Sequence, residues 1–357
     1  MLDKTTGPPH VVALVFSLSF DRPGFLVHQK RFDPGDLDVD MTGKRCLVTG
    51  ASSGLGLATS RALAGLGAEV WMLCRDPGRG ARARDEVATT SGNPEIHLAL
   101  ADLARLGDIA GFCDSFEVPE LDVLVCNAGV MPRERTITED GLELTLATNL
   151  VGHFALTWKL LPRLRAAGGE SNRPNRPGGL PGTPGDLSAG GRVITISSGG
   201  MYTQRLDIET LQGQRGRFNG MTAYAQTKRA QVIANELWAE RVAELQVSSG
   251  RTVQPSFYCM HPGWADTKGV RASMPRFHRF MARRLRSADQ GADTIVWLCA
   301  CKDIPGPSGG FFFDRRVART HMVPWTRESR QQRDDLWQCL RRWSSLDRDL
   351  DERETMA

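Results

Sequence analysis

The sequence predicts an α/β fold made of a single domain with a doubly wound parallel sheet of seven strands. Short apolar runs alternate along the chain with segments whose apolar residues recur at helical spacing. This alternation is typical of parallel strands joined by right-handed crossover helices. The short runs are apolar at nearly every position, as expected for strands that are covered by helices on both faces.

The individual elements can be placed in order from these two patterns. Leu55, Ala58, Ala62 and Leu66 show the helical spacing that follows the first strand. The expected strands cover residues 45–49, 69–73, 96–100, 122–125, 192–196, 256–260 and 311–313. The expected helices cover residues 55–66, 81–88, 148–165 and 223–245.

The 357 residues exceed what this domain needs, and the surplus lies in three places. Residues 1–43 form an N-terminal extension, and residues 44–323 form the domain. Within it, 12 of the 25 residues 167–191 are Gly or Pro, which predicts a disordered insertion. Residues 324–357 form a charged tail, in which Leu336, Leu340 and Trp343 recur at the spacing of an amphipathic helix.

The composition excludes several classes of protein. Charged residues make up 24% of the chain and the net charge is only +4, so we expect no nucleic-acid partner. The eight Cys include no CxxC pair, and Cys46, Cys74, Cys126 and Cys259 lie in apolar runs. We therefore expect no metal site and buried free thiols in a reducing compartment, which is consistent with a cytoplasmic protein.

Two segments leave membrane association open as an alternative. Residues 11–20 are apolar, but ten residues are too few to span a bilayer, which takes roughly 20. A short packed or peripheral segment is the favoured interpretation, and a membrane anchor is the alternative. Residues 275–286 are basic, with Phe277, Phe280 and Met281 at helical spacing, so this stretch is a candidate for peripheral membrane contact.

A glycine-rich turn lies between the first strand and the first helix. The segment TGASSGLG covers residues 49–56. Glycines at such a turn let the backbone approach a pyrophosphate, and the N-terminus of the following helix presents free N–H groups to it. This context predicts a dinucleotide site that involves Gly50, Ser52, Ser53, Gly54, Leu55 and Gly56.

The end of the second strand indicates which dinucleotide is bound. An acidic residue there would accept a hydrogen bond from the ribose of NAD, whereas an Arg would pair with the 2′-phosphate of NADP. The sequence has Cys74 followed by Arg75. The guanidinium fork suits phosphate, so we predict NADP(H).

A Tyr-Lys pair is the candidate catalytic part of the predicted site. Tyr224 and Lys228 are four residues apart, so they share one face of a helix. A nearby ammonium favours the phenolate, so Lys228 is expected to lower the pKa of Tyr224 and tune it for proton transfer to a carbonyl. Ser198 ends the fifth strand, at the edge of the sheet where ligands bind in such folds.

These motifs, taken in their order, resemble the short-chain dehydrogenase/reductase family over about residues 43–319. The resemblance implies a Rossmann-like domain and a catalytic tetrad of Asn149, Ser198, Tyr224 and Lys228, with a water on Asn149 that continues the proton relay. It also implies cofactor contacts from the residues that match the family's further motifs: Asp102, Leu103, Asn127, Ala128, Gly129, Pro262, Gly263 and Thr267, besides Tyr224 and Lys228.

The sequence departs from the family pattern at two points. Cys126 stands where the family has the first Asn of its NNAG motif, a position with a mainly structural role. Ser198 and Tyr224 are 26 residues apart, about twice the commonest spacing in the family, and the extra residues are expected to shape the substrate pocket.

The resemblance predicts an NADP(H)-dependent oxidoreductase that interconverts a carbonyl and an alcohol by hydride transfer, with Tyr224 as acid and base. The expected partner is a small, lipophilic carbonyl or alcohol substrate, and a homodimer is an open alternative. Two other functions stay open: a nucleotide-binding scaffold or sensor without turnover, and an enzyme of the retinol or steroid type that works in oxidation.

Overall fold

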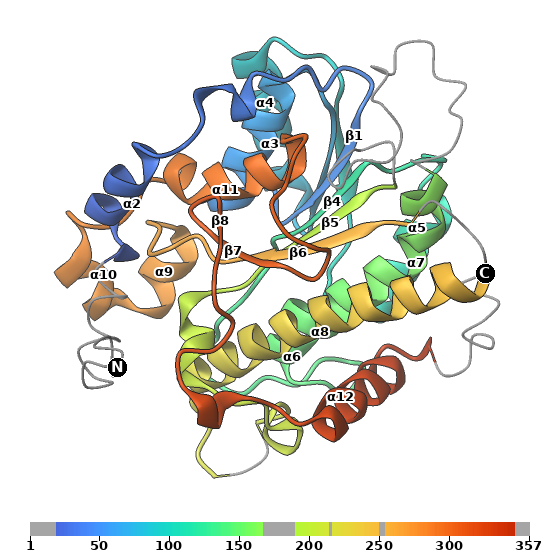
Figure 1. Ribbon diagram of the computed structural model, residues 1–357, viewed down its shortest axis with the longest axis vertical. Coiled ribbons are helices and arrows are strands. Elements are labelled where there is room, and N and C mark those ends of the chain that lie inside the picture. Colours follow the sequence, from blue (N-terminus) through green and yellow to red (C-terminus); the bar gives the residue numbers. More distant parts are fainter. Residues whose placement is uncertain (1–18, 167–189, 214–215, 250–253, 347–357) are drawn as a thin grey trace, which may run out of the picture.

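The computed structural model describes residues 19–166, 190–213, 216–249 and 254–346 of the chain. One sheet of eight strands forms its centre, in the order β3-β2-β1-β4-β5-β6-β7-β8 (Figure 1). The strands are β1 (Arg45–Thr49), β2 (Glu69–Cys74), β3 (Ile96–Leu100), β4 (Val123–Cys126), β5 (Arg192–Ile196), β6 (Ser256–Met260), β7 (Phe311–Phe313) and β8 (Arg316–Val317). The predicted α/β class and the doubly wound sheet are confirmed, and each of the seven expected strands lies within one residue of its predicted position.

The prediction of seven strands, all parallel, was wrong by one strand. β8 pairs antiparallel with β7 and closes a two-residue hairpin. The turn residues Asp314 and Arg315 have φ values of 47° and 57°, the left-handed conformation that such hairpins require and that usually selects Gly or Asn. Ion pairs from Arg286 to Asp314 and from Arg315 to Asp293 hold this turn, so the sequence carries no ordinary turn signal.

Helices cover both faces of the sheet (Figure 1). α3, α4 and α11 pack together on one face, whereas α5, α7 and α8 cover the other. Alternate residues of the strands serve the two layers: Leu47 of β1 packs into one core, and Cys46 and Val48 pack into the other. The helices are α2 (Arg22–Gln29), α3 (Gly54–Gly65), α4 (Pro77–Ser91), α5 (Leu106–Ser115), α6 (Leu144–Leu146), α7 (Gly152–Ala166), α8 (Gly220–Ser249), α9 (Lys268–Ser273), α10 (Pro275–Met281), α11 (Ala288–Ala300) and α12 (Arg330–Trp343).

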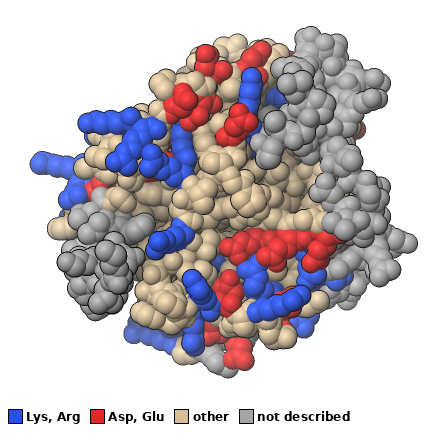
Figure 2. Space-filling view, in the orientation of Figure 1, with Lys and Arg blue, Asp and Glu red and all other residues tan. Residues whose placement is uncertain are grey.

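The predicted amphipathic helix near the C-terminus is confirmed as α12. A capping box of Ser329 and Gln332 starts it, and its apolar residues Leu336 and Leu340 are fully buried against the main core. Arg333 forms ion pairs at 2.6 Å with two glutamates of α8. Figure 2 shows the acidic row along α8 beside the basic side chains of α12. The described part of the charged tail is therefore packed onto the domain.

The start of the described chain is fastened to the far end of the fold. The buried carboxylate of Asp21 pairs with Arg284, and the backbone carbonyl of Phe20 accepts a hydrogen bond from the N–H of Trp264 at 2.7 Å. The buried guanidinium of Arg286 donates to the carbonyls of Ser19 and Asp21 at 3.0 and 3.2 Å. Residues 19–29 thus form part of the packed structure beside β7 and α10.

Several expectations fall partly or wholly outside the described residues. Of the insertion at 167–191, only residues 190 and 191 are described, and of the apolar run at 11–20 only residues 19 and 20. All eight Cys are buried and free, as the sequence predicted for four of them. Within the described ranges, no helix is both long enough and apolar enough to cross a membrane.

Candidate active site

The glycine-rich turn has the backbone that its sequence predicts. Gly50 and Gly54 have φ values of 65° and 59°, which only glycine adopts readily. At Gly56, a Cβ would come within 2.5 Å of the carbonyl oxygen of Gly50 and of the side-chain nitrogen of Asn127. Ser53 begins α3 but makes no side-chain cap. The turn is therefore tightly folded, and the N-terminus of α3 is left without a cap from its own side chain.

Asn127 and Thr49 hold this turn against the end of β4. The Asn127 side-chain amide donates to the Thr49 carbonyl at 2.8 Å. The Thr49 hydroxyl accepts from the backbone N–H groups of Asn127 and Ala128, both at 2.9 Å, and it lies 3.0 Å from Nε2 of His153. Sequence reasoning did not identify this contact of His153, because its partner Thr49 is 104 residues away.

The residues that were predicted to select the cofactor lie together at the end of β2. Arg75 is 57% exposed, and its Nη1 lies 3.8 Å from Oδ2 of Asp102, the expected adenine-side residue. Burial raises the pKa of the Cys74 thiol to about 11, although a hydrogen bond with Ser52 opposes this shift. Cys74 is therefore neutral at physiological pH, and a phosphate beside Arg75 and Ser52 would meet no repulsion from it.

Leu103 is the predicted cofactor residue that packs into the core. Its side chain is buried, and its carbonyl oxygen lies 2.2 Å from where a Cβ of Gly152 would stand, at the start of α7. Leu55 is half-buried, with its side chain against Gly291 of α11. The side chains of Leu103 and Leu55 thus serve packing at the edges of the site.

The structure brings Ser198, Tyr224 and Lys228 together at the carboxyl end of β5. A hydrogen bond links the Ser198 side chain to Tyr224. Nζ of Lys228 lies 5.4 Å from the centre of the Tyr224 ring and donates to the carbonyl of Ile196 at 2.7 Å. Gly129 lies beside them, since a Cβ there would come within 3.8 Å of that Nζ.

The expected lowering of the Tyr224 pKa by Lys228 is wrong for this structure. Burial raises the pKa of Tyr224, and only the hydrogen bond from Ser198 opposes that shift. Burial also lowers the pKa of Lys228 to about 8, against some opposing influence of the Cys259 and Cys126 thiols. Burial is thus the largest cause of both shifts, and Tyr224 is a protonated phenol at neutral pH.

Asn149 lies in a π turn, η2 (Ala147–Val151), which precedes α7 where the sequence predicted a regular helix. Its side chain both accepts from the N–H of Val130 at 2.8 Å and donates to the Val130 carbonyl at 3.0 Å. Its own carbonyl accepts from Gln231 Nε2 at 2.5 Å and lies 3.1 Å from His153 Nδ1. Gln231 thus occupies one lone pair of the backbone carbonyl at which the resemblance implied a bound water, and the role of His153 Nδ1 depends on its tautomer.

The Pro262-Gly263 turn lies over the opposite side of the site and depends on Arg286. Gly263 has a φ of 71°, and a Cβ there would come within 2.5 Å of both the Arg286 guanidinium and the Phe20 carbonyl. Arg286 also donates to the Pro262 carbonyl at 3.3 Å. Thr267 caps α9, and its methyl group lies 3.5 Å from where a Cβ of Gly54 would stand. This segment therefore reaches across to the glycine-rich turn.

An aromatic cluster beside this turn was missed by the sequence reasoning. His261 is fully buried, stacks on Phe313 with ring centres 4.2 Å apart, and meets Phe20 edge-on at 4.5 Å. Phe20 in turn covers Gly199, next to Ser198, because a Cβ at Gly199 would come within 2.9 Å of its ring. Burial lowers the pKa of His261 to about 3, so the cluster is uncharged.

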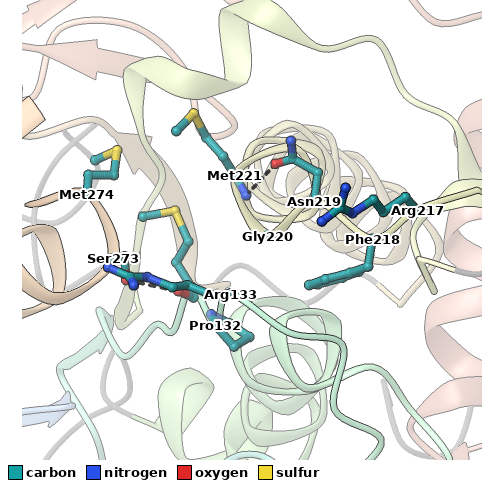
Figure 3. Close-up of a pocket in the computed structure, with 10 residues that line it drawn as sticks. Pro132, Arg133, Arg217, Phe218, Asn219, Gly220, Met221, Ser273 and Met274 are labelled. Atoms are coloured by element: carbon teal, nitrogen blue, oxygen red, sulfur yellow. Dashed lines mark hydrogen bonds between the residues drawn. The ribbon is translucent and has the colours of Figure 1, made fainter. Parts of the chain in front are cut away.

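A cavity of about 550 Å³ opens at the start of α8, the helix that carries Tyr224 (Figure 3). Three segments that are distant in sequence line it: residues 131–133 after the Asn127–Gly129 motif, residues 217–221 at the start of α8, and residues 273–274 between α9 and α10. The second segment includes part of the extra residues between Ser198 and Tyr224 that the sequence predicted would shape the substrate pocket.

Comparisons with known proteins agree with this geometry. The sequence pattern of the family described as short chain dehydrogenase matches residues 44–171. The chain is 40% identical over 305 residues to dehydrogenase/reductase SDR family member 12 of Bos taurus, covering 85% of this chain and 86% of that protein. It is 32% identical over 286 residues to retinol dehydrogenase 11 of Homo sapiens, covering 78% and 80% of the two chains. A solved structure of a Mycobacterium paratuberculosis protein superposes with a TM-score of 0.63 at 26% identity, covering 86% of this chain and 95% of that one.

Proposed function

The chain belongs to the short-chain dehydrogenase/reductase family of nicotinamide-dependent oxidoreductases, and we propose that it is an NADP(H)-dependent enzyme that interconverts a carbonyl and an alcohol. The observation that carries this proposal is the meeting of Ser198, Tyr224 and Lys228 at the end of β5, across from the glycine-rich turn. The proposed catalytic domain covers residues 44–323.

The residues of the turn fit a dinucleotide. The glycine backbone at Gly50 and Gly54, the uncapped start of α3 and the absence of a Cβ at Gly56 suit the close approach of a pyrophosphate. Asn127, Ala128 and Gly129 would lie along its path, and Pro262, Gly263 and Thr267 would hold the nicotinamide end. Asp102 would accept from the adenine.

NADP(H) is the form of the cofactor that we propose. Arg75 offers a half-exposed guanidinium, and its neighbour Cys74 is a neutral thiol where an NAD-binding site would carry a carboxylate. The Ser52 hydroxyl lies against that thiol and would be a second donor to the 2′-phosphate. A bidentate guanidinium–phosphate pair is among the stronger charge-assisted contacts in proteins.

In the proposed chemistry, the cofactor supplies or accepts the hydride, and the protein moves the proton. Tyr224, a protonated phenol, donates its proton to the carbonyl oxygen during reduction. Ser198 holds the same oxygen and stabilises its developing negative charge. The ammonium of Lys228 then stabilises the phenolate that remains, and it would also hold the nicotinamide ribose.

We assign Asn149 a positioning part within this tetrad. Its side chain fixes the backbone at Val130, and its carbonyl is bonded by Gln231 and His153. Together these contacts set the π turn that places α7 beside the site.

A lipophilic substrate and contact with a membrane surface are part of the proposal. A relative that is 32% identical is named for retinol, an apolar alcohol. Phe280 of α10 is 86% exposed, and Arg276, Arg279 and Arg283 around it are exposed as well. Figure 2 shows basic side chains gathered at the left of the view, where Figure 1 has α2 and α10. This combination suits an anionic bilayer surface.

A single experiment distinguishes the proposed function from two alternatives. A nucleotide-binding scaffold would bind NADPH without turnover, and an oxidation-directed enzyme would act on alcohols with NADP⁺. We would follow NADPH absorbance over a panel of carbonyls and alcohols with the wild type, Tyr224→Phe and the control Tyr258→Phe, whose ring lies in the other core of the domain. The proposal expects Tyr224→Phe to bind NADPH normally but to lose at least about a hundredfold in turnover. Undiminished turnover in Tyr224→Phe would contradict the proposal.

A further inference from the structure

The cavity at the start of α8 combines two kinds of surface. Met131, Met221, Met274 and Phe218 form an apolar wall along part of it, whereas Arg133 and Arg217 bring two guanidinium groups to the same space, and more of the lining surface is polar than apolar. Figure 3 shows Met221 and Met274 on one side of the space and Phe218 with Arg217 on the other. No acidic side chain is among the residues that line it.

The apolar wall suits a flexible hydrocarbon body. Methionine side chains are unbranched and polarizable, so they adapt to ligands of irregular shape. A volume of about 550 Å³ falls in the range of pockets that bind small organic molecules.

The two arginines are not used by ion pairs within the described structure. Arg133 donates to the carbonyl of Ala272 at 3.1 Å, which occupies one of its five N–H groups. Arg217 is exposed, and no acidic partner faces it among the described residues. Neighbouring arginines differ, since Arg271 pairs with Asp266 and Arg284 with Asp21. Two cations without counter-charges at one cavity favour an anionic ligand.

The cavity is connected to the chemical centre through the backbone. Met221 lies three residues before Tyr224 on α8, so the two share nearly the same face of that helix. Gly220 packs so closely on the 131–133 segment that a Cβ would lie 1.9 Å from the Pro132 carbonyl oxygen. The cavity and Tyr224 therefore both lie at the first turns of α8.

We propose that this cavity binds the substrate, and that the substrate is a carbonyl or alcohol compound with an apolar body and a carboxylate or phosphate group held by Arg133 and Arg217. This inference rests on the proposed function for the chemistry at Tyr224, but its anion-binding part stands on the cavity alone.

The test separates binding from turnover. Binding of dodecanoate, dodecyl phosphate and dodecanol to the full chain saturated with NADPH is measured by calorimetry. Turnover is measured with 12-oxododecanoate and its methyl ester. We expect both anions to bind at least about tenfold more tightly than dodecanol, a factor of ten being 1.4 kcal/mol. Arg217→Gln and Arg133→Gln should each weaken the anions several-fold and leave dodecanol unchanged.

The matched control is Arg316→Gln, which removes an exposed arginine on β8 that does not line the cavity. It should behave as the wild type. A preference for dodecanoate over dodecyl phosphate, or the reverse, identifies which anion the site takes. Equal binding of dodecanol and both anions, or anion binding that survives in both cavity variants, overturns the inference. Anion binding that depends on the two arginines, with no turnover of either 12-oxo compound, supports the site but counts against the proposed function.

Discussion

The guanidinium of Arg75 lies 3.8 Å from the carboxylate of Asp102, across the end of the sheet where β2 and β3 finish. Both residues were predicted to bind the adenosine end of a dinucleotide, and the structure brings them together although they are 27 residues apart in sequence. At this separation and exposure the pair is weak. A ligand phosphate that offers two oxygens can therefore take the guanidinium from Asp102 at small cost.

Replacing Arg75 should change which cofactor the protein prefers. We expect Arg75→Ala to weaken NADPH binding by about 10- to 100-fold, because a charge-assisted contact to the 2′-phosphate is lost. NADH, which has no such phosphate, should bind almost as before. Fluorescence titration with both nucleotides measures this, with Arg84→Ala on α4 as the exposed control. Equal losses for NADH and NADPH would contradict the assignment of Arg75.

The proposed carbonyl reduction should slow as the pH rises through about 8. Burial lowers the pKa of Lys228 to about 8, so its ammonium is present below that pH and is lost above it. Tyr224, with a raised pKa, keeps its proton over the same range. The profile of kcat/KM against pH should therefore bend downward near pH 8 in the wild type. Lys228→Met should be slower throughout and lack this bend.

Circular dichroism at each pH is the control for unfolding. A wild-type profile that stays flat to pH 10 with a folded protein would show that the Lys228 charge is not needed.

Breaking the buried pair of Arg286 and Asp314 should destabilise the fold strongly. Both side chains are almost completely buried, with contacts at 2.6 and 2.9 Å. Arg286→Met leaves the buried Asp314 carboxylate without its guanidinium partner, so we expect a loss of about 3–5 kcal/mol in the free energy of unfolding. Urea denaturation measures it.

The double variant Arg286→Met/Asp314→Asn is the matched comparison, because Asn tolerates the left-handed backbone at 314 and carries no charge. It should lose clearly less stability than Arg286→Met alone. Equal losses would mean that the methionine disturbs packing and that the buried charge is not the cause.

The surface of α10 should govern binding to anionic vesicles. We expect Phe280→Ser to lower partitioning into phosphatidylserine vesicles by about tenfold, since an aromatic side chain loses its burial in the bilayer. Arg279→Gln should lower it by about fivefold and only on anionic vesicles. Co-sedimentation measures both effects.

Trp325→Ser is the control, because Trp325 is also exposed, at 70%, but lies in the short turn η6 (Pro324–Thr326) away from α10. A loss of vesicle binding in this variant as large as in Phe280→Ser would point to general hydrophobicity rather than to a specific surface.

The parts of the fold that follow from local patterns were predictable. The strand, turn and helix at residues 45–65 form from neighbouring residues, and the glycines at 50 and 54 have the positive φ values that their motif implies. The eighth strand was missed because its turn relies on Asp314 and Arg315, which are held by side chains from α11 and from the segment just before it. These stabilising contacts come from residues distant in sequence, so the four residues of the turn do not reveal them.

The residues that make up the site could be predicted from the sequence more reliably than their pKa shifts. The spacing of Tyr224 and Lys228 correctly indicates that they are neighbours, but the sign of the Tyr224 pKa shift depends on how deeply both are buried. Burial comes from strands and helices distant in sequence. Arg286 was overlooked for a related reason, since it ends the basic stretch 275–286 with four other arginines and only the fold distinguishes the one that is buried.

The attachment of residues 19–29 to Arg286 has a consequence for the order of folding during synthesis. Asp21 and Arg286 are 265 residues apart, and Asp314 is made later still. At about 5–20 residues per second, the ribosome needs roughly 15–50 s to make the intervening chain. Residues 19–29 must therefore stay undocked until nearly the whole domain has been synthesised. Because the Pro262-Gly263 turn also contacts Arg286 and Phe20, its closure is one of the last steps of folding.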